Sequence, residues 1–466
     1  MRKIHIILIV SLLFLSTSEL SAEKKVKKNA KKKQTTATTS EKAKDSPAIY
    51  NDIVGTTPEK DAFSEDWEAG AKTQTALSGD FAEMGTEIRG IIKNHNFVMS
   101  GVPCSLQGLP IIYTSKSTGF NLGARLSFAD LRYEDPYFYR LAFQLWFSDR
   151  GARNHEINLD MPHFITKRWH LRMAYKYVAV IDNNYFGIGN DAVFNKDFVR
   201  PSSSNYIART YYQYILTYPS FTFNIEYNIF KKLFSIYTGI ALEKAVIDPR
   251  DFDSTSKIFT EKPYGYNGGK TNYIRAGLKF DSRDYEYNPS KGIVLEATYT
   301  DHARFIDSDY QYRNADLNYM GFYSFIRYFT IGHRVMLDQM WGDLPFFALA
   351  EFRSYERYQG LGGEDILRGA PTFRFIDNLK LIHQIELRTR FYNGQILGQH
   401  LQFSIAPFWD IGRVWDRRGK IDFKNFHNSF GSEFRFTWNM NFIASFSFGV
   451  SHEAMSTYLS FGETFD

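Results

Sequence analysis

Apolar and polar residues alternate along most of the chain, from about residue 117 to its end. In GFNLGARLSF (119–128), every second residue from Phe120 to Phe128 is apolar, and the residues between are polar or glycine. FTFNIEYNIF (221–230) and SFGSEFRFTWNM (429–440) follow the same pattern. A period of two predicts strands with one apolar and one polar face.

The composition indicates which medium the apolar faces meet. Aromatic residues make up 17% of the chain, with Phe 42 and Tyr 30, yet the mean hydropathy is −0.36. A soluble sandwich also alternates, but it rarely makes its buried face so aromatic over so many strands. Aromatic outward faces and polar inward faces are typical of a transmembrane β-barrel, in which closure satisfies the backbone groups inside lipid.

We therefore predict an all-β fold, an antiparallel transmembrane β-barrel of sixteen strands, since an even number is the rule for single-chain bacterial outer-membrane barrels. The strands are expected to begin near residues 119, 139, 156, 171, 207, 221, 234, 272, 293, 312, 334, 379, 401, 429, 441 and 457. In the last strand, Leu459, Phe461 and Phe465 share one face, an aromatic terminal signal of the kind that outer-membrane assembly machinery reads.

The N-terminal residues predict export. A basic start and an apolar run from Ile4 to Leu15 precede small residues at 21 and 22, the layout of a secretory signal peptide over 1–22. The alternative, a membrane anchor, is disfavoured because the run is too short to cross a bilayer. The predicted location is the bacterial outer membrane, reached through the Sec pathway with cleavage of the signal peptide.

Three further segments follow the signal peptide. Residues 23–62 form a Lys/Thr-rich tether without an apolar face, predicted to be disordered. Its lysines could instead lie on anionic lipid or an acidic cell-wall polymer. Residues 63–104 are a short N-terminal segment with a weak helical pattern, and 105–466 form the barrel. A single cysteine, Cys104, excludes an intramolecular disulfide framework, and the net charge of +5 leaves no basic face for nucleic acid.

Four stretches resemble the BamA/TamA outer-membrane assembly superfamily, also called the bacterial surface antigen family. They are LPIIYTSKSTGFNLGA (109–124), KFDSRDYEYNPSKGIVLEATY (279–299), GGEDILRGAPTFRFID (362–377) and APFWDIGRVWD (406–416). The third resembles the inward-folded loop of the family, with its Arg-Gly pair, and the fourth resembles the strand with an aromatic-x-Asp-x-Gly pattern. The resemblance covers roughly residues 105–466 and implies outer-membrane lipid and unfolded barrel clients as partners.

The parity of the strands after this loop predicts where the loop attaches. In LKLIHQIELRTRF (379–391) and LQFSIAPFWDIG (401–412), the apolar residues have odd numbers, so Glu386 and Asp410 point to the lumen. Two acids on neighbouring walls suit a guanidinium, which presents five donors in a planar fork. The resemblance implies the same contacts, with Arg368 reaching Asp410 and Glu386 as a latch. The alternative is an ordinary surface loop. Glycines let the backbone approach the wall, namely Gly360, Gly362, Gly363 and Gly369.

The chain departs from the family pattern in two ways. Ala370 stands where the family has an aromatic after Arg-Gly, so Phe373 or Phe375 is expected to take over its packing. No POTRA module is recognisable between the signal peptide and the barrel. Either a separate periplasmic partner receives the clients, or the barrel has another task.

Motifs for catalysis and metal binding are not apparent. There is no Gly-x-Ser-x-Gly elbow, and the 11 histidines are scattered without paired ligand spacing. We therefore predict no enzyme activity, cofactor or metal. The first hypothesis is an insertase or translocase that opens between its first strand, near 119–128, and its last. The alternatives are a passive pore for small solutes or lipids, and a surface adhesin or scaffold.

Overall fold

The computed structural model describes residues 93–461 apart from short internal gaps. These gaps are residues 116, 133–136, 231–232, 249–254, 286–287, 327, 356, 397–398, 417–420 and 439–441. The predicted signal peptide, the tether, residues 63–92, Phe465 and the side chain of Phe461 lie outside the described residues.

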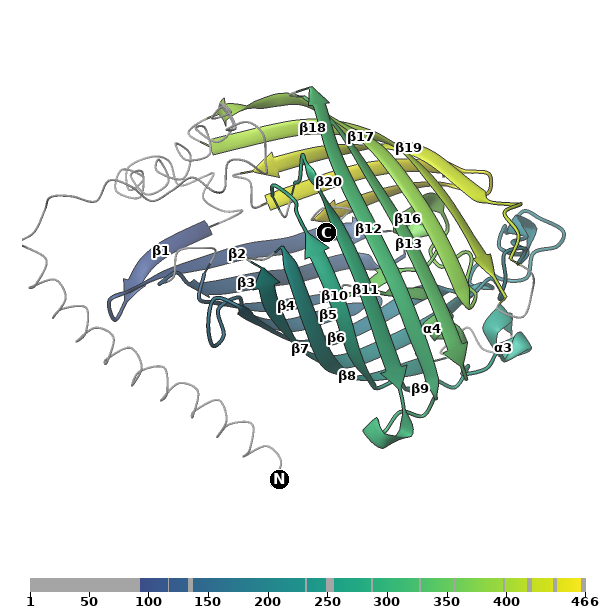
Figure 1. Ribbon diagram of the computed structural model, residues 1–466. Helices are drawn as coiled ribbons and strands as arrows, with labels where there is room; N and C mark the ends of the chain where they lie inside the picture. Colours follow the sequence, from purple (N-terminus) through teal and green to yellow (C-terminus); the bar gives the residue numbers. More distant parts are fainter. Residues whose placement is uncertain are drawn as a thin grey trace, which may run out of the picture. The chain divides into compact units, whose positions relative to one another are not determined.

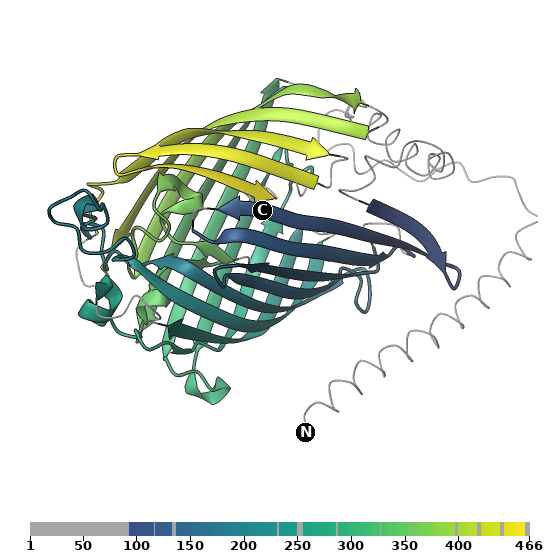
Figure 2. The same ribbon diagram turned by 180° about the vertical axis from the view of Figure 1, so that it is seen from behind.

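One antiparallel sheet of eighteen strands dominates the described residues. Its strands are β1 (Lys93–Met99), β2 (Val102–Ser115), β3 (Gly119–Asp130), β4 (Tyr139–Ser148), β5 (Arg153–Met161), β6 (Trp169–Asn184), β7 (Gln213–Phe230), β8 (Phe234–Asp248), β9 (Gly269–Lys270), β10 (Tyr273–Asp281), β11 (Gly292–His302), β12 (Tyr312–Ile326), β13 (Phe329–Gly342), β17 (Leu379–Ile396), β18 (Gln399–Trp415), β19 (His427–Trp438), β20 (Phe442–Ser451) and β21 (Met455–Phe461). Apart from the two-residue β9, which pairs with β8, each strand pairs with the next along the sheet. The strands curve around one interior (Figures 1 and 2).

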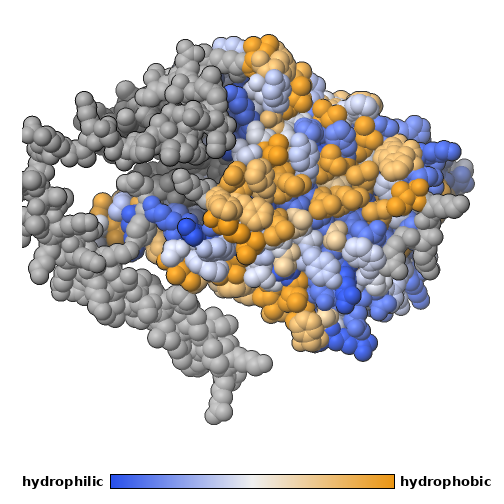
Figure 3. All heavy atoms as spheres, viewed as in Figure 1, coloured by the Kyte–Doolittle hydropathy of each residue, from blue (hydrophilic) through white to orange (hydrophobic). Residues whose placement is uncertain are grey.

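Burial in the sheet is the reverse of that in a soluble protein. Leu126, Leu145 and Leu459 are 51%, 62% and 60% exposed on the outer face, whereas Asp338 and Glu386 on the inner face are 0% and 1% exposed. Hydrophobic residues accordingly gather over the strands in Figure 3. The predicted two-faced strands are therefore confirmed, and the polar faces line the interior.

None of the described helices is long and apolar enough to span a membrane. The helices are short: α3 (Lys257–Glu261), α4 (Phe346–Leu349) and the 3-10 turns η2 (Lys196–Phe198) and η4 (Arg304–Ile306).

Three strand predictions require correction. Residues 207 and 221 were expected to begin separate strands, but residues 213–230 form the single strand β7, in which Pro219 interrupts the alternation. Residues 93–104, expected in a helical segment, form β1 and the start of β2. The stretch 119–128 lies in β3, which pairs with β2 and β4, so it is not at an edge. Pro103 and Pro110 argue against a strand in the sequence, because proline lacks the backbone N–H that donates to the neighbouring strand.

The edges of the sheet are β1 and β21. β1 pairs with residues 102–108 of β2, and β21 pairs with β20. Within the described part of the chain, no ladder joins β21 to β1, β2 or β3.

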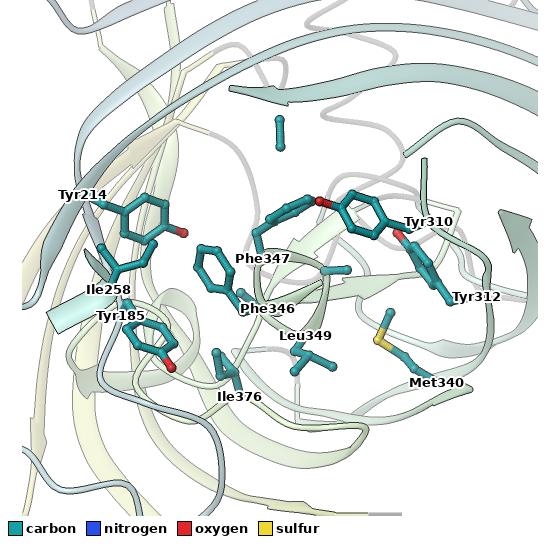
Figure 4. Close-up of a cluster of buried hydrophobic side chains, with 13 residues drawn as sticks. Tyr185, Tyr214, Ile258, Tyr310, Tyr312, Met340, Phe346, Phe347, Leu349 and Ile376 are labelled. Carbon is teal, nitrogen blue, oxygen red and sulfur yellow. The ribbon is translucent and has the colours of Figure 1, made fainter. Parts of the chain in front are cut away.

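Every second connection lies at the same end of an up-and-down sheet, and the four longest lie at one end, the loop end, together with residues 303–311. The four longest are residues 185–212, 249–272, 343–378 and 416–426. A buried aromatic cluster joins several of them (Figure 4). In this cluster, Phe346 packs against Tyr185 and Tyr214, with ring centroids 5.3 Å and 5.4 Å apart. The loops at this end therefore pack on one another.

Candidate functional site

Residues 343–378, the inner segment, leave the loop end after β13 and return to β17. They contain α4, β14 (Glu351–Arg353), β15 (Arg357–Gln359) and β16 (Gly363–Ala370). β14 and β15 pair with each other in a separate two-stranded sheet. The segment is therefore not part of the wall, and it lies against the polar inner face.

An apolar patch on three wall strands supports the inner segment. Met336 of β13, Ile382 of β17 and Val414 of β18 are buried and pack against apolar residues of the segment. The packed residues of the segment are Phe352, Leu361, Ile366, Leu367, Ala370 and Phe375. The inner segment is therefore held to the wall by apolar packing as well as by polar contacts.

Arg368 of β16 makes a three-point contact with Asp410 of β18. Its backbone N–H and its Nε both donate to Asp410 Oδ2, at 2.9 Å and 3.0 Å, and Nη2 donates to Oδ1 at 2.8 Å. Both side chains are 0% exposed. A planar guanidinium and a carboxylate that meet in this bidentate way form a strong, directional pair.

Two further carboxylates face the same guanidinium. Arg368 Nη1 lies 3.4 Å from Glu433 Oε2 and 3.6 Å from Glu386 Oε2. Burial alone would lower the pKa of the Arg368 guanidinium, but Asp410, Glu386 and Glu433 raise that pKa above its usual value. Arg368 therefore stays charged inside the wall.

Two arginines of the wall offset the negative charge of Glu386 and Glu433. Arg435 Nη2 donates to Glu386 Oε2 at 3.0 Å, and its Nε donates to Glu433 Oε1 at 2.6 Å. Arg388 Nε donates to Glu386 Oε1 at 2.5 Å. Three cations and three carboxylates thus form one compact network on β16–β19, which we call the Arg368 anchor.

The aromatic partner of Arg368 comes from the wall. The Arg368 guanidinium lies 3.5 Å from the centre of the Phe408 ring, in the FWDIG stretch of β18. Phe375 instead stacks on His427, with centroids 3.6 Å apart, and Phe373 packs beside the aromatic cluster of Figure 4. Phe375 also belongs to the same buried apolar cluster as Ala370, and the expectation that it takes over the packing of the aromatic missing there stays a prediction.

Gly369 passes over the inner face of β20, where its backbone lies directly against the β20 backbone. Its φ is 101°, and a Cβ there would lie 2.6 Å from the backbone of Gly449 and Val450 in β20. A Cβ on Gly449 would in turn lie 2.7 Å from the Arg368 carbonyl. Of the other predicted loop glycines, Gly362 and Gly363 have positive φ values, while Gly360 is pressed against Ala350.

A second set of contacts holds the start of the segment to the opposite part of the sheet. Arg357 Nη2 lies 2.8 Å from Glu243 Oε2 in β8, and Arg353 Nη1 lies 3.5 Å from the same oxygen. Tyr218 of β7 donates to that oxygen at 2.6 Å. Two arginine side chains of the inner segment therefore form ion pairs with the same Glu243 carboxylate.

The backbone between these arginines is also held. Arg275 of β10 donates to the carbonyl oxygens of Tyr355 and Ser354, at 2.7 Å and 3.2 Å. Glu296 of β11 accepts from the Tyr355 N–H at 2.5 Å. We call these contacts on β7, β8, β10 and β11 the Glu243 anchor.

At the loop end, the segment meets the turn that precedes β21. Arg374 Nε and Nη2 donate to Glu453, at 2.5 Å and 2.7 Å, and Nη2 also donates to the Ala192 carbonyl. The Gly189 N–H donates to the Ile376 carbonyl at 2.9 Å. This contact joins the inner segment, the 185–212 connection and the β20–β21 turn.

The structure thus brings the predicted residues Arg368, Asp410 and Glu386 together. It adds Glu433, Arg435, Arg388, Phe408 and Gly449, which sequence reasoning did not place in the site. Leu459 lies on the outer face of β21, away from the anchor. Among residues 93–461 as described, no group of three or more His, Cys, Asp or Glu side chains is arranged to hold a metal ion.

Comparison with known proteins finds relatives of the fold. The family model described as the Omp85 superfamily domain matches residues 117–453. BamA from Haemophilus ducreyi lacking POTRA domains 1–3 superposes with a TM-score of 0.50 at 13% identity, over 86% of this chain and 78% of that one. CdiB from Escherichia coli gives 0.48 at 11% identity, over 79% of this chain and 66% of that one. Comparison with curated proteins gives no match.

Proposed function

The chain belongs to the Omp85 superfamily, and from that premise we propose that it inserts or translocates proteins at the bacterial outer membrane through a lateral seam in its wall. Unfolded outer-membrane proteins would be its clients, and a separate periplasmic protein would deliver them. Export by a signal peptide at 1–22 and tethering by 23–62 remain predictions that accompany this proposal.

The observation that carries the seam is the pair of strand edges at the two ends of the sheet. Residues 109–115 of β2 pair with β3 on one side only, and β21 pairs with β20 on one side only, within the described residues. An unpaired edge offers backbone N–H and C=O groups to an incoming strand. The seam predicted at 119–128 is accordingly moved to β2, because β3 is flanked on both sides.

The inner segment would hold the wall strands on the C-terminal side of the proposed seam in place, so that the edges can separate while the rest of the wall stays fixed. The Arg368 anchor rests on β17–β19, and Gly369 touches β20. The Ser451 hydroxyl donates to the Gly369 carbonyl at 3.1 Å, and Tyr458 of β21 donates to the Ala370 carbonyl at 3.4 Å. These contacts brace the C-terminal side of the seam from within.

The polar interior favours one alternative, a passive pore for small solutes or lipids. Buried charged side chains line the inner face, and the inner segment would constrict such a channel. A pore does not need its edges to separate, whereas an insertase does.

A cross-link across the seam distinguishes the two functions. In a Cys104→Ser background, Ile112→Cys on β2 and Leu459→Cys on β21 are joined by a short bismaleimide. We expect the cross-linked protein in liposomes to fold a urea-unfolded eight-stranded barrel at least tenfold more slowly, as measured by the heat-dependent shift of the client on gels. Its conductance in planar bilayers should be unchanged.

A matched control joins two strands that already pair. Leu126 and Phe143 are directly opposite each other in β3 and β4, and both side chains are exposed on the outer face. The doubly substituted Leu126→Cys, Phe143→Cys protein should keep its folding activity after cross-linking. Failure of the seam cross-link to form, or equal activity with and without it, would reject the seam.

A further inference from the structure

β1 is, with β21, one of the two long strands of the sheet that pair with a single neighbour among the described residues. Its described part, Lys93–Met99, begins at the first described residue and pairs with β2 alone among the described strands. Phe97, Val98 and Met99 are 39%, 70% and 51% exposed. An isolated hairpin strand is marginally stable, because one ladder must offset the ordering of a whole strand.

β1 nevertheless occupies a decisive position. Residues 102–108 of β2 pair with β1, and residues 109–115 lack a ladder partner on that edge among the described residues. β2 is 14 residues long, and the described part of β1 covers residues 102–108 of the edge at which the proposed seam would receive a client. The connection is a two-residue turn, Ser100-Gly101, with φ values of 52° and 79°, the positive pair typical of tight hairpins.

We propose that β1 is a displaceable cover strand, an internal stand-in for the client strand, which an incoming strand must replace to pair with the full length of β2. This inference rests on the proposed function and identifies its substrate-binding edge. The client would be an unfolded polypeptide with alternating apolar and polar residues.

The exchange conserves backbone hydrogen bonds. A client strand that begins on residues 109–115 gains new pairs at once and then replaces β1 residue by residue along 102–108. Each step breaks one β1–β2 pair and forms one client–β2 pair of the same kind. The net change in hydrogen bonding is therefore small, and the client advances because it also gains residues 109–115, which no described strand pairs on that edge.

The native cysteine makes a specific lock possible. Phe97 is directly opposite Cys104 in the β1–β2 ladder. Opposite residues in an antiparallel pair have Cβ atoms roughly 4.5–5.5 Å apart, close to the separation a disulfide requires. Phe97→Cys should therefore form a disulfide with Cys104 under mild oxidant and fix β1 on β2. Val98→Cys is the matched control, because residue 98 is opposite Pro103 and faces the other side of the strand.

The test measures folding of a urea-unfolded eight-stranded barrel by the full-length protein in liposomes, with disulfide formation followed by mass spectrometry. We expect oxidised Phe97→Cys to fold the client at least tenfold more slowly, dithiothreitol to restore the rate, and Val98→Cys to respond to neither treatment. A variant in which a Gly-Ser linker replaces residues 93–99 should fold the client faster than the wild type.

Two outcomes would overturn the cover-strand proposal alone. One is the absence of the 97–104 disulfide in the folded protein, and the other is full activity of the locked protein while the Ile112–Leu459 cross-link still blocks folding. If neither lock affects the client, the proposed function itself fails, and the role of β1 fails with it.

Discussion

Two of the attachments between the inner segment and the wall have opposite arrangements of charge. At the Arg368 anchor, one side chain of the segment inserts among three wall carboxylates and is 0% exposed. At the Glu243 anchor, two segment arginines share one wall carboxylate, and the side chain of Arg357 is 32% exposed. There, wall side chains also bind the backbone of the segment.

This difference indicates what each anchor contributes. A buried guanidinium with a bidentate carboxylate is specific for its residue type, because no other side chain presents the same donors. Contacts to backbone carbonyls accept any side chain at the bound position. The Arg368 anchor therefore fixes one geometry beside the seam, whereas the Glu243 anchor also includes backbone contacts that do not depend on residue type and holds the segment across the interior.

The largest effect is expected from Arg368→Ala. Removal of the Arg368 guanidinium leaves Asp410 buried without its bidentate partner, which should lower the free energy of unfolding by about 2–5 kcal/mol. The midpoint of urea unfolding in detergent, followed by the heat-dependent gel shift, measures this loss. Arg368→Lys keeps the charge but not the fork and should lie between wild type and alanine. An unchanged midpoint for Arg368→Ala would contradict the anchor.

Gly369→Ala should have the next largest effect. The new Cβ adds a left-handed backbone penalty of about 1–2 kcal/mol and also collides with the backbone of β20. Gly101→Ala is the matched control, since Gly101 has a φ of 79° and no atom within 4 Å of a Cβ. The same urea titration should give a clearly smaller loss for Gly101→Ala, and equal losses would argue against a close crossing.

Arg357→Gln should destabilise less than either change. Its ion pair with Glu243 is partly exposed, and Arg353 remains beside the same carboxylate, so we expect a loss of about 0.5–1 kcal/mol. A loss as large as that of Arg368→Ala would show that the two anchors are equivalent and would end the comparison.

The smallest effect is expected for the coupling energy between the two anchors. This is the difference between the loss of unfolding free energy in the double variant and the sum of the losses in the single variants. Arg368 and Arg357 contact different carboxylates among the described residues, so the losses in Arg368→Ala, Arg357→Gln should add to within about 0.5 kcal/mol. Urea midpoints of the two single variants and the double variant give the coupling. A larger value would mean that the inner segment moves as one rigid body between its anchors.

Much of the wall and part of the site were predictable because a strand repeats every two residues. Parity placed Asp410 and Glu386 inside, next to the loop that carries Arg368. The same parity placed Glu433 inside, but it did not reveal that Glu433 faces Arg368, because partners across strands depend on register. Register is set by turns and bulges, such as the shift in the β6–β7 ladder between Val180 and Asn183.

Other features were beyond sequence reasoning for identifiable reasons. β2 was missed because its prolines interrupt the expected pattern, although Pro110 is directly opposite Ala124 in the ladder. The Glu243 anchor was missed because Arg275 binds carbonyl oxygens, which every residue carries. Gly449 was missed because a glycine in a strand gives no indication of what passes over it.

The crossing of Gly369 and Gly449 has a mechanical consequence. Long side chains between two elements absorb small displacements by changing rotamer, but two bare backbones in contact have no such slack. Any inward or outward shift of the segment at this point is therefore passed directly to β20, and through its ladder to β21. A force on the inner segment is thereby transmitted through β20 to β21, the strand at the edge of the sheet.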